Sequence, residues 1–142
     1  MKKALYIICM AFGILSFTGC THNNGDIGPW FGQWKVERID KDGQPDPEYQ
    51  GNCLLRFQSS VVTAVLVTDN GYTTSSSVKY GNWEESGGYM HFEFKEYSNA
   101  PLEALHFDTV CSLKVLDREG KNKRLQLAKD DGTVYTYYLV KW

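Results

Sequence analysis

The chain has 142 residues, of which 42% are hydrophobic and 23% charged, and its formal net charge at pH 7 is −2. This length suits one domain with a real core and is too short for two. The densest basic cluster, Lys121 to Arg124, lies between two strand-like segments, and we interpret it as a solvated turn. The charge pattern argues against nucleic acid as a partner.

The first 20 residues have the pattern of an export signal. Two lysines precede a largely apolar segment at 4–17, and small residues lead to Cys20, as at a cleavage site. A transmembrane helix needs about 20 apolar residues, so this segment is too short to span a bilayer. It resembles the lipobox of bacterial lipoproteins, with Phe17 where leucine is usual. The resemblance implies loss of residues 1–19 and acylation of Cys20, for example with palmitate. Plain secretion is the alternative.

A lipidated Cys20 would make the membrane the first partner of this protein. Many surface-exported lipoproteins of Bacteroidetes carry an acidic run directly after that cysteine, whereas residues 21–26 hold a single acidic residue. The resemblance therefore implies a lipid-anchored position in the cell envelope that faces the periplasm. We expect residues 20–30 to form a tether and residues 31–142 to form the folded domain.

Cys53 and Cys111 are the two cysteines that remain in the folded domain once Cys9 leaves with the signal. In an oxidising compartment they can form a disulfide, which would stabilise the fold by about 4 kcal/mol. Two unpaired, buried thiols are the alternative, and the spacing does not decide between them. No Cys-x-x-Cys motif occurs, so a zinc or thioredoxin-like centre has no support.

From residue 32 onward, apolar and polar residues alternate with period two, which predicts an all-β domain. Turn residues at Asp69-Asn70-Gly71, Gly87-Gly88 and Asp131-Gly132 favour tight hairpins. Sequential hairpins imply an antiparallel up-and-down order. We predict eight strands, at 32–39, 52–58, 61–68, 72–83, 88–97, 109–116, 123–129 and 133–141.

Each predicted strand places its apolar residues on one face, as Met90, Phe92 and Phe94 illustrate. Closure into a single eight-stranded antiparallel barrel buries these faces and leaves no unpaired edge. The charged outer faces exclude a barrel embedded in lipid. The side chains expected inside are Trp34, Val36, Leu55, Phe57, Phe92, Phe94, Leu113, Leu127 and Tyr137.

The tripeptide Gly32-Gln33-Trp34 opens the first predicted strand, and Gly81-Asn82-Trp83 repeats it in the middle of the chain. It resembles the Gly-x-Trp motif that opens the first strand of lipocalins. Residues 30–142 as a whole look like the short lipocalin-like lipoproteins of Bacteroidetes. This resemblance implies that Gly32 lets the backbone bend at the base of the barrel, which Trp34 plugs. We expect Trp83 to belong to the same set of base and interior residues.

In lipocalins a basic side chain late in the chain often packs over the first tryptophan, and Lys141 matches it by position. Such a cation–π contact is worth roughly 0.5 to 1 kcal/mol when it is exposed. The helix that follows the eighth strand of lipocalins has no counterpart before Trp142.

Two connections are longer than a hairpin needs. Residues 40–51 form a polar loop at the position where lipocalins carry a lid over the open mouth. Residues 98–108 include a short helical segment at 101–105, with Ser98 or Asn99 as its cap and Pro101 in its first turn. Each connection either gates the interior or is an ordinary surface loop.

Catalytic motifs are absent from the sequence: it has no nucleophile elbow, phosphate loop, zinc-protease motif or dinucleotide fingerprint. We therefore expect neither an enzyme nor a cofactor. His91 and Glu93, and likewise His106 and Asp108, could each supply two metal ligands, but no third ligand is identifiable. We interpret both pairs as solvated surface residues and expect no metal site.

The leading functional hypothesis is a lipid-anchored envelope protein that holds a small apolar or amphipathic ligand in or at the mouth of its barrel. Eight strands enclose an interior that side chains fill or that holds one small ligand. The alternative is a protein-interaction or inhibitor module with a filled barrel. Such a module would use its long loops or the aromatic residues Tyr72, Tyr97 and Trp142.

Overall fold

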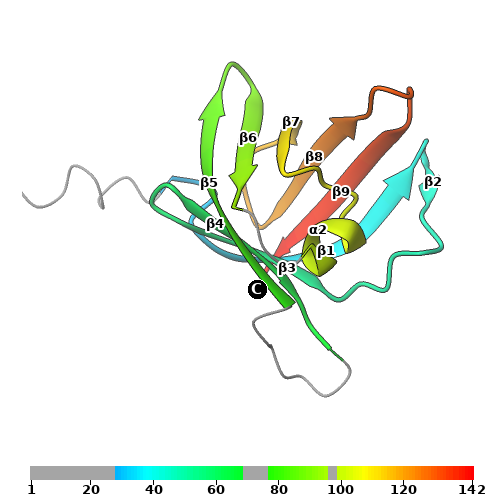
Figure 1. The fold of residues 1–142 in the computed structure, drawn as a ribbon. Coiled ribbons are helices and arrows are strands. Elements are labelled where there is room, and N and C mark those ends of the chain that lie inside the picture. Colours follow the sequence, from blue (N-terminus) through cyan, green and yellow to red (C-terminus); the bar gives the residue numbers. More distant parts are fainter. Residues whose placement is uncertain (1–27, 69–76, 96–98) are drawn as a thin grey trace, which may run out of the picture.

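The computed structural model describes residues 28–68, 77–95 and 99–142 (Figure 1). Cys20, most of the expected tether, the predicted turn at 69–71 and Ser98 lie outside the described residues. In the described part of the chain, no helix is long and apolar enough to cross a bilayer. The elements are β1 (Gly32–Lys41), β2 (Gln44–Pro45), β3 (Cys53–Gln58), β4 (Val61–Leu66), β5 (Val78–Ser86), β6 (Tyr89–Phe94), α2 (Ala100–Ala104), β7 (Val110–Asp117), β8 (Asn122–Ala128) and β9 (Val134–Lys141).

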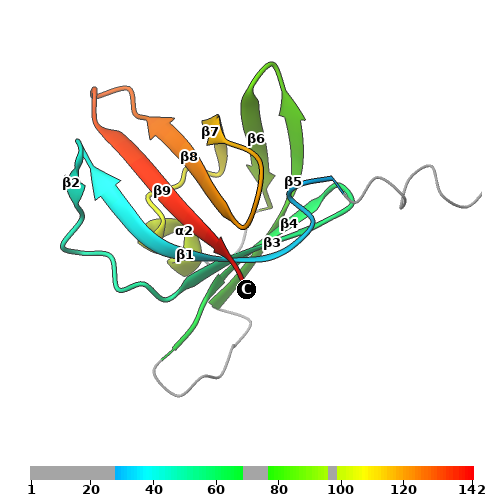
Figure 2. The ribbon, with the colours of Figure 1, turned by 180° about the vertical axis from the view of Figure 1, so that it is seen from behind.

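Eight of these strands form one closed antiparallel barrel, which confirms the predicted fold class. Each strand pairs with the next along the chain, in the order β1, β3, β4, β5, β6, β7, β8 and β9. The barrel closes where β9 pairs with β1, from Trp34 opposite Lys141 to Lys41 opposite Tyr135. Figure 2 shows β1 and β9 side by side from behind. Closure satisfies the backbone groups that an open sheet would leave unpaired at its edges.

The observed strands differ most from the predicted ones in two places. The first strand continues to Lys41 and turns at Asp42 and Gly43, both with positive φ, so that the two-residue β2 folds back on it. The predicted strand at 72–83 stops short of the observed end: β5 runs from Val78 to Ser86, and residues 72–76 lie outside the described residues. Its extension arises because Trp83 to Ser86 pair with β6 through the hairpin at Gly87-Gly88.

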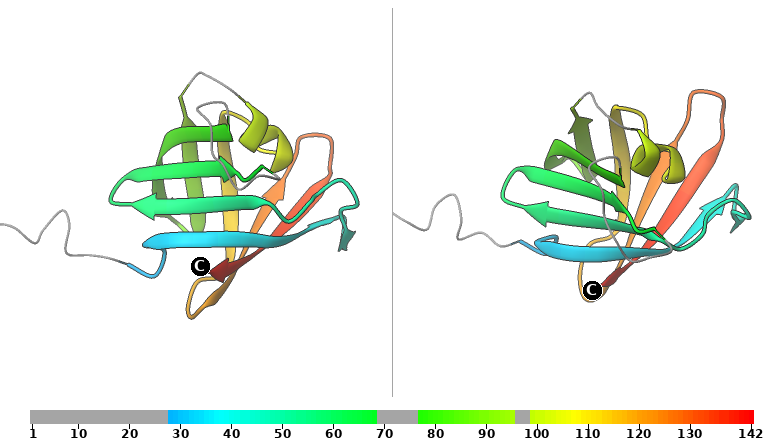
Figure 3. Two further views of the ribbon diagram at one scale, coloured as in Figure 1. Left: turned by 90° about the horizontal axis from the view of Figure 1, so that it is seen from below. Right: turned by 60° about the horizontal axis from the view of Figure 1, so that its bottom comes forward.

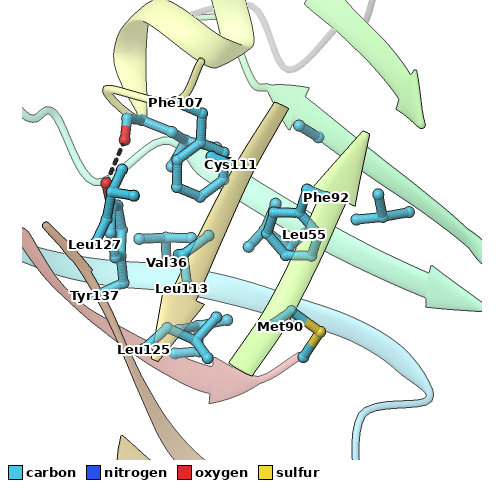
Figure 4. Close-up of a cluster of buried hydrophobic side chains, with 14 of the residues drawn as sticks. Val36, Leu55, Met90, Phe92, Phe107, Cys111, Leu113, Leu125, Leu127 and Tyr137 are labelled. Carbon is cyan, nitrogen blue, oxygen red and sulfur yellow. Dashed lines mark hydrogen bonds between the residues drawn. The ribbon is translucent and has the colours of Figure 1, made fainter. Parts of the chain in front are cut away.

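The barrel interior is filled by apolar side chains, which alternate with more exposed ones along most strands, whereas four consecutive residues of β4, Val62 to Val65, are buried. In β3 the residues Cys53, Leu55 and Phe57 are buried, and in β6 Met90, Phe92 and Phe94 are buried. Figure 4 shows Leu55, Met90 and Phe92 converging with side chains of β1, β7, β8 and β9. The single apolar face that period two predicts is therefore the core of the barrel.

The two ends of the barrel are formed by different connections. We call the end with residues 28–31 and the turns at 59–60, 87–88 and 118–121 the base, because β1 starts there and β9 ends there. The opposite end, which we call the mouth, carries the connection that contains α2. Figure 3 shows α2 lying against this end of the barrel.

Candidate functional site

The indole ring of Trp34 lies at the base of the barrel and is 1% exposed. Its Nε1 donates a hydrogen bond to the carbonyl oxygen of Trp30 at 2.7 Å. The Lys141 Nζ lies 4.5 Å from the centroid of the Trp34 ring, and it donates a hydrogen bond to the carbonyl oxygen of Phe31. The end of the last strand therefore covers the tryptophan of the first strand, with the geometry of a cation–π contact.

Gly32 is required by this packing for two reasons. Its φ is +102°, a conformation that side-chain-bearing residues rarely adopt. A Cβ at this position would also lie 2.6 Å from the Lys141 Nζ. The glycine of the first Gly-x-Trp tripeptide thus allows the turn into β1 and leaves room for the ammonium group above Trp34.

Lys123 departs from the sequence interpretation, which assigned it to a solvated turn. It is 1% exposed and lies inside β8, with its Nζ 4.9 Å from the ring centroid of Trp30 and 4.8 Å from that of Trp34. The Nζ donates a hydrogen bond to the carbonyl oxygen of Arg118. Burial lowers the pKa of the Lys123 ammonium group, because the charged form loses its hydration. The prediction of a solvated turn was therefore wrong for this residue.

The other expected interior residues occupy the barrel core or its edge. Phe57, Phe92, Phe94, Leu113 and Tyr137 are buried. The rings of Phe57, Phe92, Phe94 and Tyr137 form a connected aromatic cluster with Phe107, whose ring centroid lies 5.7 Å from that of Phe92 and 5.1 Å from that of Tyr137. Trp83 is only partly buried and packs edge-on against Phe57 at 5.1 Å.

The mouth is occupied by the segment from Asn99 to Thr109, which we call the α2 segment. Leu102, Leu105 and Phe107 are buried and belong to the same hydrophobic core as the strand residues. The Tyr137 hydroxyl donates a hydrogen bond to the carbonyl oxygen of Leu105 at 2.7 Å, the dashed line in Figure 4. Part of the interior is thus filled by a connection rather than by a strand.

Asn99 is the N-cap residue of α2, but its side chain makes no capping hydrogen bond. Its Oδ1 instead accepts a hydrogen bond from the Lys79 Nζ at 3.3 Å. The cap residue therefore attaches the α2 segment to β5.

His106 lies beside Asp46, not beside the expected Asp108. Its Nε2 is 2.7 Å from the Asp46 Oδ2, and its ring stacks on Tyr135 at 4.4 Å. Asp108 pairs with Lys129 instead. The interpretation of His106 as a solvated partner of Asp108 was wrong, because folding brings the β1–β3 connection against the α2 segment.

Asp46, Glu48 and His106 each offer a potential metal-ligand atom, and these atoms lie within 4.8 Å of one another. The sequence pattern paired His106 with Asp108, whereas the fold places His106 beside Asp46 and Glu48. Both oxygens of Asp46 already accept hydrogen bonds, one from the Glu48 backbone N–H and one at the His106 ring. Asp46 therefore joins the β1–β3 connection to the α2 segment at the mouth.

The second histidine lies on the outer face of β6. The His91 Nδ1 is 2.7 Å from the Ser112 Oγ on β7, and the ring stacks on Tyr89 at 6.3 Å. These contacts lie across the outside of the sheet, away from the barrel interior.

Cys53 and Cys111 are buried, free thiols. They lie on β3 and β7, which are separated by three strands in either direction around the barrel. Neighbouring strands are about 4.8 Å apart, whereas a disulfide needs a Cα separation below about 7 Å. Burial raises the pKa of each thiol to about 12, so both stay protonated at neutral pH.

The arrangement of the strands is shared with two solved structures from Bacteroides. A lipocalin-like protein from Bacteroides uniformis superposes with a TM-score of 0.62 at 19% identity, over 81% of this chain and all of that one. The fold is lipocalin-like. An uncharacterized protein from Bacteroides eggerthii superposes with a TM-score of 0.58, also at 19% identity, over 80% of this chain and 99% of that one.

No protein-family model and no curated protein sequence matches the chain. At 19% identity the two structural similarities establish the lipocalin-like fold alone. Any binding site of this lipocalin-like barrel is therefore inferred from its own side chains.

Three residues of these sites were missed by sequence reasoning. Trp30, assigned to the tether, is 1% exposed and lies in the core. Lys123 precedes Leu125 and Leu127 at period-two spacing, so an extension of that pattern places it inside. Asp46 carried no such signal, because its partner His106 lies 60 residues away in the sequence.

Proposed function

We propose that this lipocalin-like protein is lipid-anchored in the cell envelope and binds a small apolar or amphipathic molecule at the mouth of its barrel. The observation that supports this most strongly is the α2 segment. Leu102, Leu105 and Phe107 fill the mouth end of the core from a connection between strands. A ligand that took their place would leave the hydrogen bonds of the barrel intact. Proteins with this fold are usually binding proteins rather than enzymes.

The α2 segment is held in a way that would let a ligand replace its buried side chains. A five-residue helix has little stability of its own, so tertiary contacts hold it in place. The described polar contacts include Tyr137 with Leu105, His106 with Asp46 and Lys79 with Asn99. Burial of three apolar side chains contributes roughly 1.5 to 3 kcal/mol each. A ligand that offers comparable apolar area can compete with them.

Native mass spectrometry tests this proposal. The protein is exported with Cys20→Ser, which keeps it soluble, and is purified without denaturant. We expect a bound mass of a few hundred daltons that is lost on denaturation. Phe107→Ala enlarges the mouth and should raise its occupancy, whereas Val110→Ala, at a side chain 68% exposed, should not. The bare chain mass in all three variants, with no uptake from a lipid extract, would contradict the proposal.

A second candidate function is protein binding, and the filled core favours it. If side chains occupy the whole interior permanently, the protein can bind a partner only through its exposed surface. Phe31, Val110 and Trp142 are exposed apolar residues, and Trp142 is 69% exposed. Two results together would favour this second function. The Phe107→Ala variant would take up no ligand, and a Trp142→Ser variant would lose a protein partner that the unaltered protein captures.

A further inference from the structure

Three side chains from two different connections meet at the mouth of the barrel. Asp46 and Glu48 belong to the β1–β3 connection, and His106 belongs to the α2 segment (Figure 1). One oxygen of each carboxylate and one ring nitrogen of His106 lie within 4.8 Å of one another. The sequence predicts no metal site here, because it pairs His106 with Asp108 alone. The fold instead supplies two other carboxylates, and with them a third ligand.

Asp46 is fixed in the position that a metal ligand needs. Its side chain is only 2% exposed, and its Oδ2 lies 2.7 Å from the His106 Nε2. Its Oδ1 accepts a hydrogen bond from the Glu48 backbone N–H at 3.1 Å, the kind of contact that orients a ligating carboxylate. An ionised carboxylate only accepts hydrogen bonds, so the Nε2 carries the proton of the contact with His106. An ion can replace that proton with a small movement, since two ligand atoms on a tetrahedral zinc ion are about 3.3 Å apart.

The other two ligands differ in how firmly they are held. The His106 ring stacks on the Tyr135 ring at 4.4 Å and 13°. Its side chain is 21% exposed, so water reaches the imidazole. Glu48 is exposed, and its described hydrogen bonds use its backbone N–H and carbonyl oxygen. Its carboxylate can therefore turn toward an ion that Asp46 and His106 already hold.

The surface beside His106 is strongly acidic. His106 and Tyr135 line a surface pocket of about 650 Å³ whose walls also contain four carboxylates and one lysine, at Glu103, Asp108, Asp130, Asp131 and Lys129. The Lys129 ammonium group pairs with Asp108. The remaining negative charges attract cations to this side of the mouth. The pocket thus gives a metal ion a route to the imidazole.

We propose that Asp46, Glu48 and His106 bind one divalent transition-metal ion, with Zn²⁺ as the best match. Imidazole favours zinc over magnesium or calcium, and two carboxylates balance the charge of the ion. Three protein ligands leave a fourth position for water. The bound ion would join the β1–β3 connection to the α2 segment. This site does not depend on the ligand proposed for the mouth, because its residues bind the ion through polar groups outside the apolar core.

Titration of the Cys20→Ser protein with ZnCl₂, followed by calorimetry, tests this site. We expect Zn²⁺ to bind and to shift the His106 ring-nitrogen signal in a ¹⁵N NMR spectrum. It should also raise the midpoint of urea unfolding, because the assembled site exists only in the folded chain. His106→Gln keeps a hydrogen-bond donor for Asp46 but removes the imidazole, and Glu48→Gln removes one carboxylate. Each substitution should weaken zinc binding at least about tenfold.

The second histidine and its neighbouring glutamate provide matched controls. His91 and Glu93 lie on the outer face of β6, and His91→Gln and Glu93→Gln should leave the zinc affinity unchanged. If His106→Gln fails to fold, Glu48→Gln at its exposed position still decides. No binding of Zn²⁺, or binding that is equally tight in the unaltered protein and in Glu48→Gln, would overturn the proposal. An unshifted His106 signal at saturating Zn²⁺ would overturn it as well.

Discussion

The ammonium group of Lys123 lies 4.8 Å from the ring centroid of Trp34, inside the base of the barrel. Its aliphatic stem occupies space in the core, and its Nζ is held by the Arg118 carbonyl oxygen. Lys123→Ala should therefore destabilise the protein by about 2 to 4 kcal/mol, as a large-to-small change in a core does. Lys121→Ala, at an exposed position two residues earlier, should stay within about 0.5 kcal/mol. Urea unfolding of both variants measures the difference, and equal stabilities would contradict the burial of Lys123.

Gly32→Ala combines backbone strain with a clash, because φ is +102° and the new Cβ would meet the Lys141 Nζ. Gly120 is the matched control: its φ is +81°, but a Cβ there meets nothing within 4 Å. We expect Gly32→Ala to cost about 2 to 3 kcal/mol and Gly120→Ala about 1 kcal/mol. Thermal unfolding separates the two effects, and identical shifts would show that the Lys141 contact is unimportant.

Glycine opens both Gly-x-Trp tripeptides, and Gly81→Ala should destabilise the protein more than Gly32→Ala does. A Cβ at Gly81 would lie 2.6 Å from the Glu93 carbonyl oxygen and 2.9 Å from the Phe94 Cα. Backbone cannot move aside as a lysine side chain can, so β5 and β6 would have to separate. We expect a loss of more than about 3 kcal/mol, or failure to fold. A Gly81→Ala protein as stable as Gly32→Ala would show that the sheet yields easily at this point.

Tyr137→Phe removes the hydroxyl that holds the α2 segment at Leu105. The loss of this buried hydrogen bond should cost about 1 kcal/mol. Hydrogen exchange of the amides in the α2 segment should quicken more than that of the strand amides. Tyr80→Phe, at an exposed tyrosine, is the control and should alter neither quantity. Unchanged exchange in the Tyr137→Phe variant would show that apolar packing alone holds the segment.

The Cys53 thiol makes stability depend on alkaline pH. Its pKa is raised by burial from 9.0 to about 12 in the folded protein, so above pH 9 the unfolded chain binds fewer protons than the folded one. Stability is therefore fully present below pH 9 and falls as the pH rises, by at most about 1.4 kcal/mol per pH unit. Cys53→Ala should make the slope of stability against pH shallower. Val65→Ala is the control: it should lower the stability and leave that slope unchanged. Urea unfolding between about pH 8 and pH 10 measures the slopes.

Much of the barrel could be predicted from the sequence because its causes are local. Alternation such as Met90, Phe92 and Phe94 decides which face of a strand is buried, and pairs such as Gly87-Gly88 place the hairpins. The Gly-x-Trp tripeptide at Gly32 marks the first strand of the barrel. Each feature depends on residues within one or two positions of each other, where backbone geometry alone acts.

Part of what fills the two ends of the barrel was decided only by the tertiary structure. The resemblance to lipocalins predicts Lys141 over Trp34, as observed, whereas only the crossing of two connections brings His106 to Asp46. Lys123 is buried because the rings of Trp30 and Trp34 surround it, although a lysine in a basic run normally stays in water. The sequence by itself determined a closed β-barrel of alternating strands. Contacts between residues far apart in the chain depend on strand register and on how the connections cross, which period-two patterning does not specify.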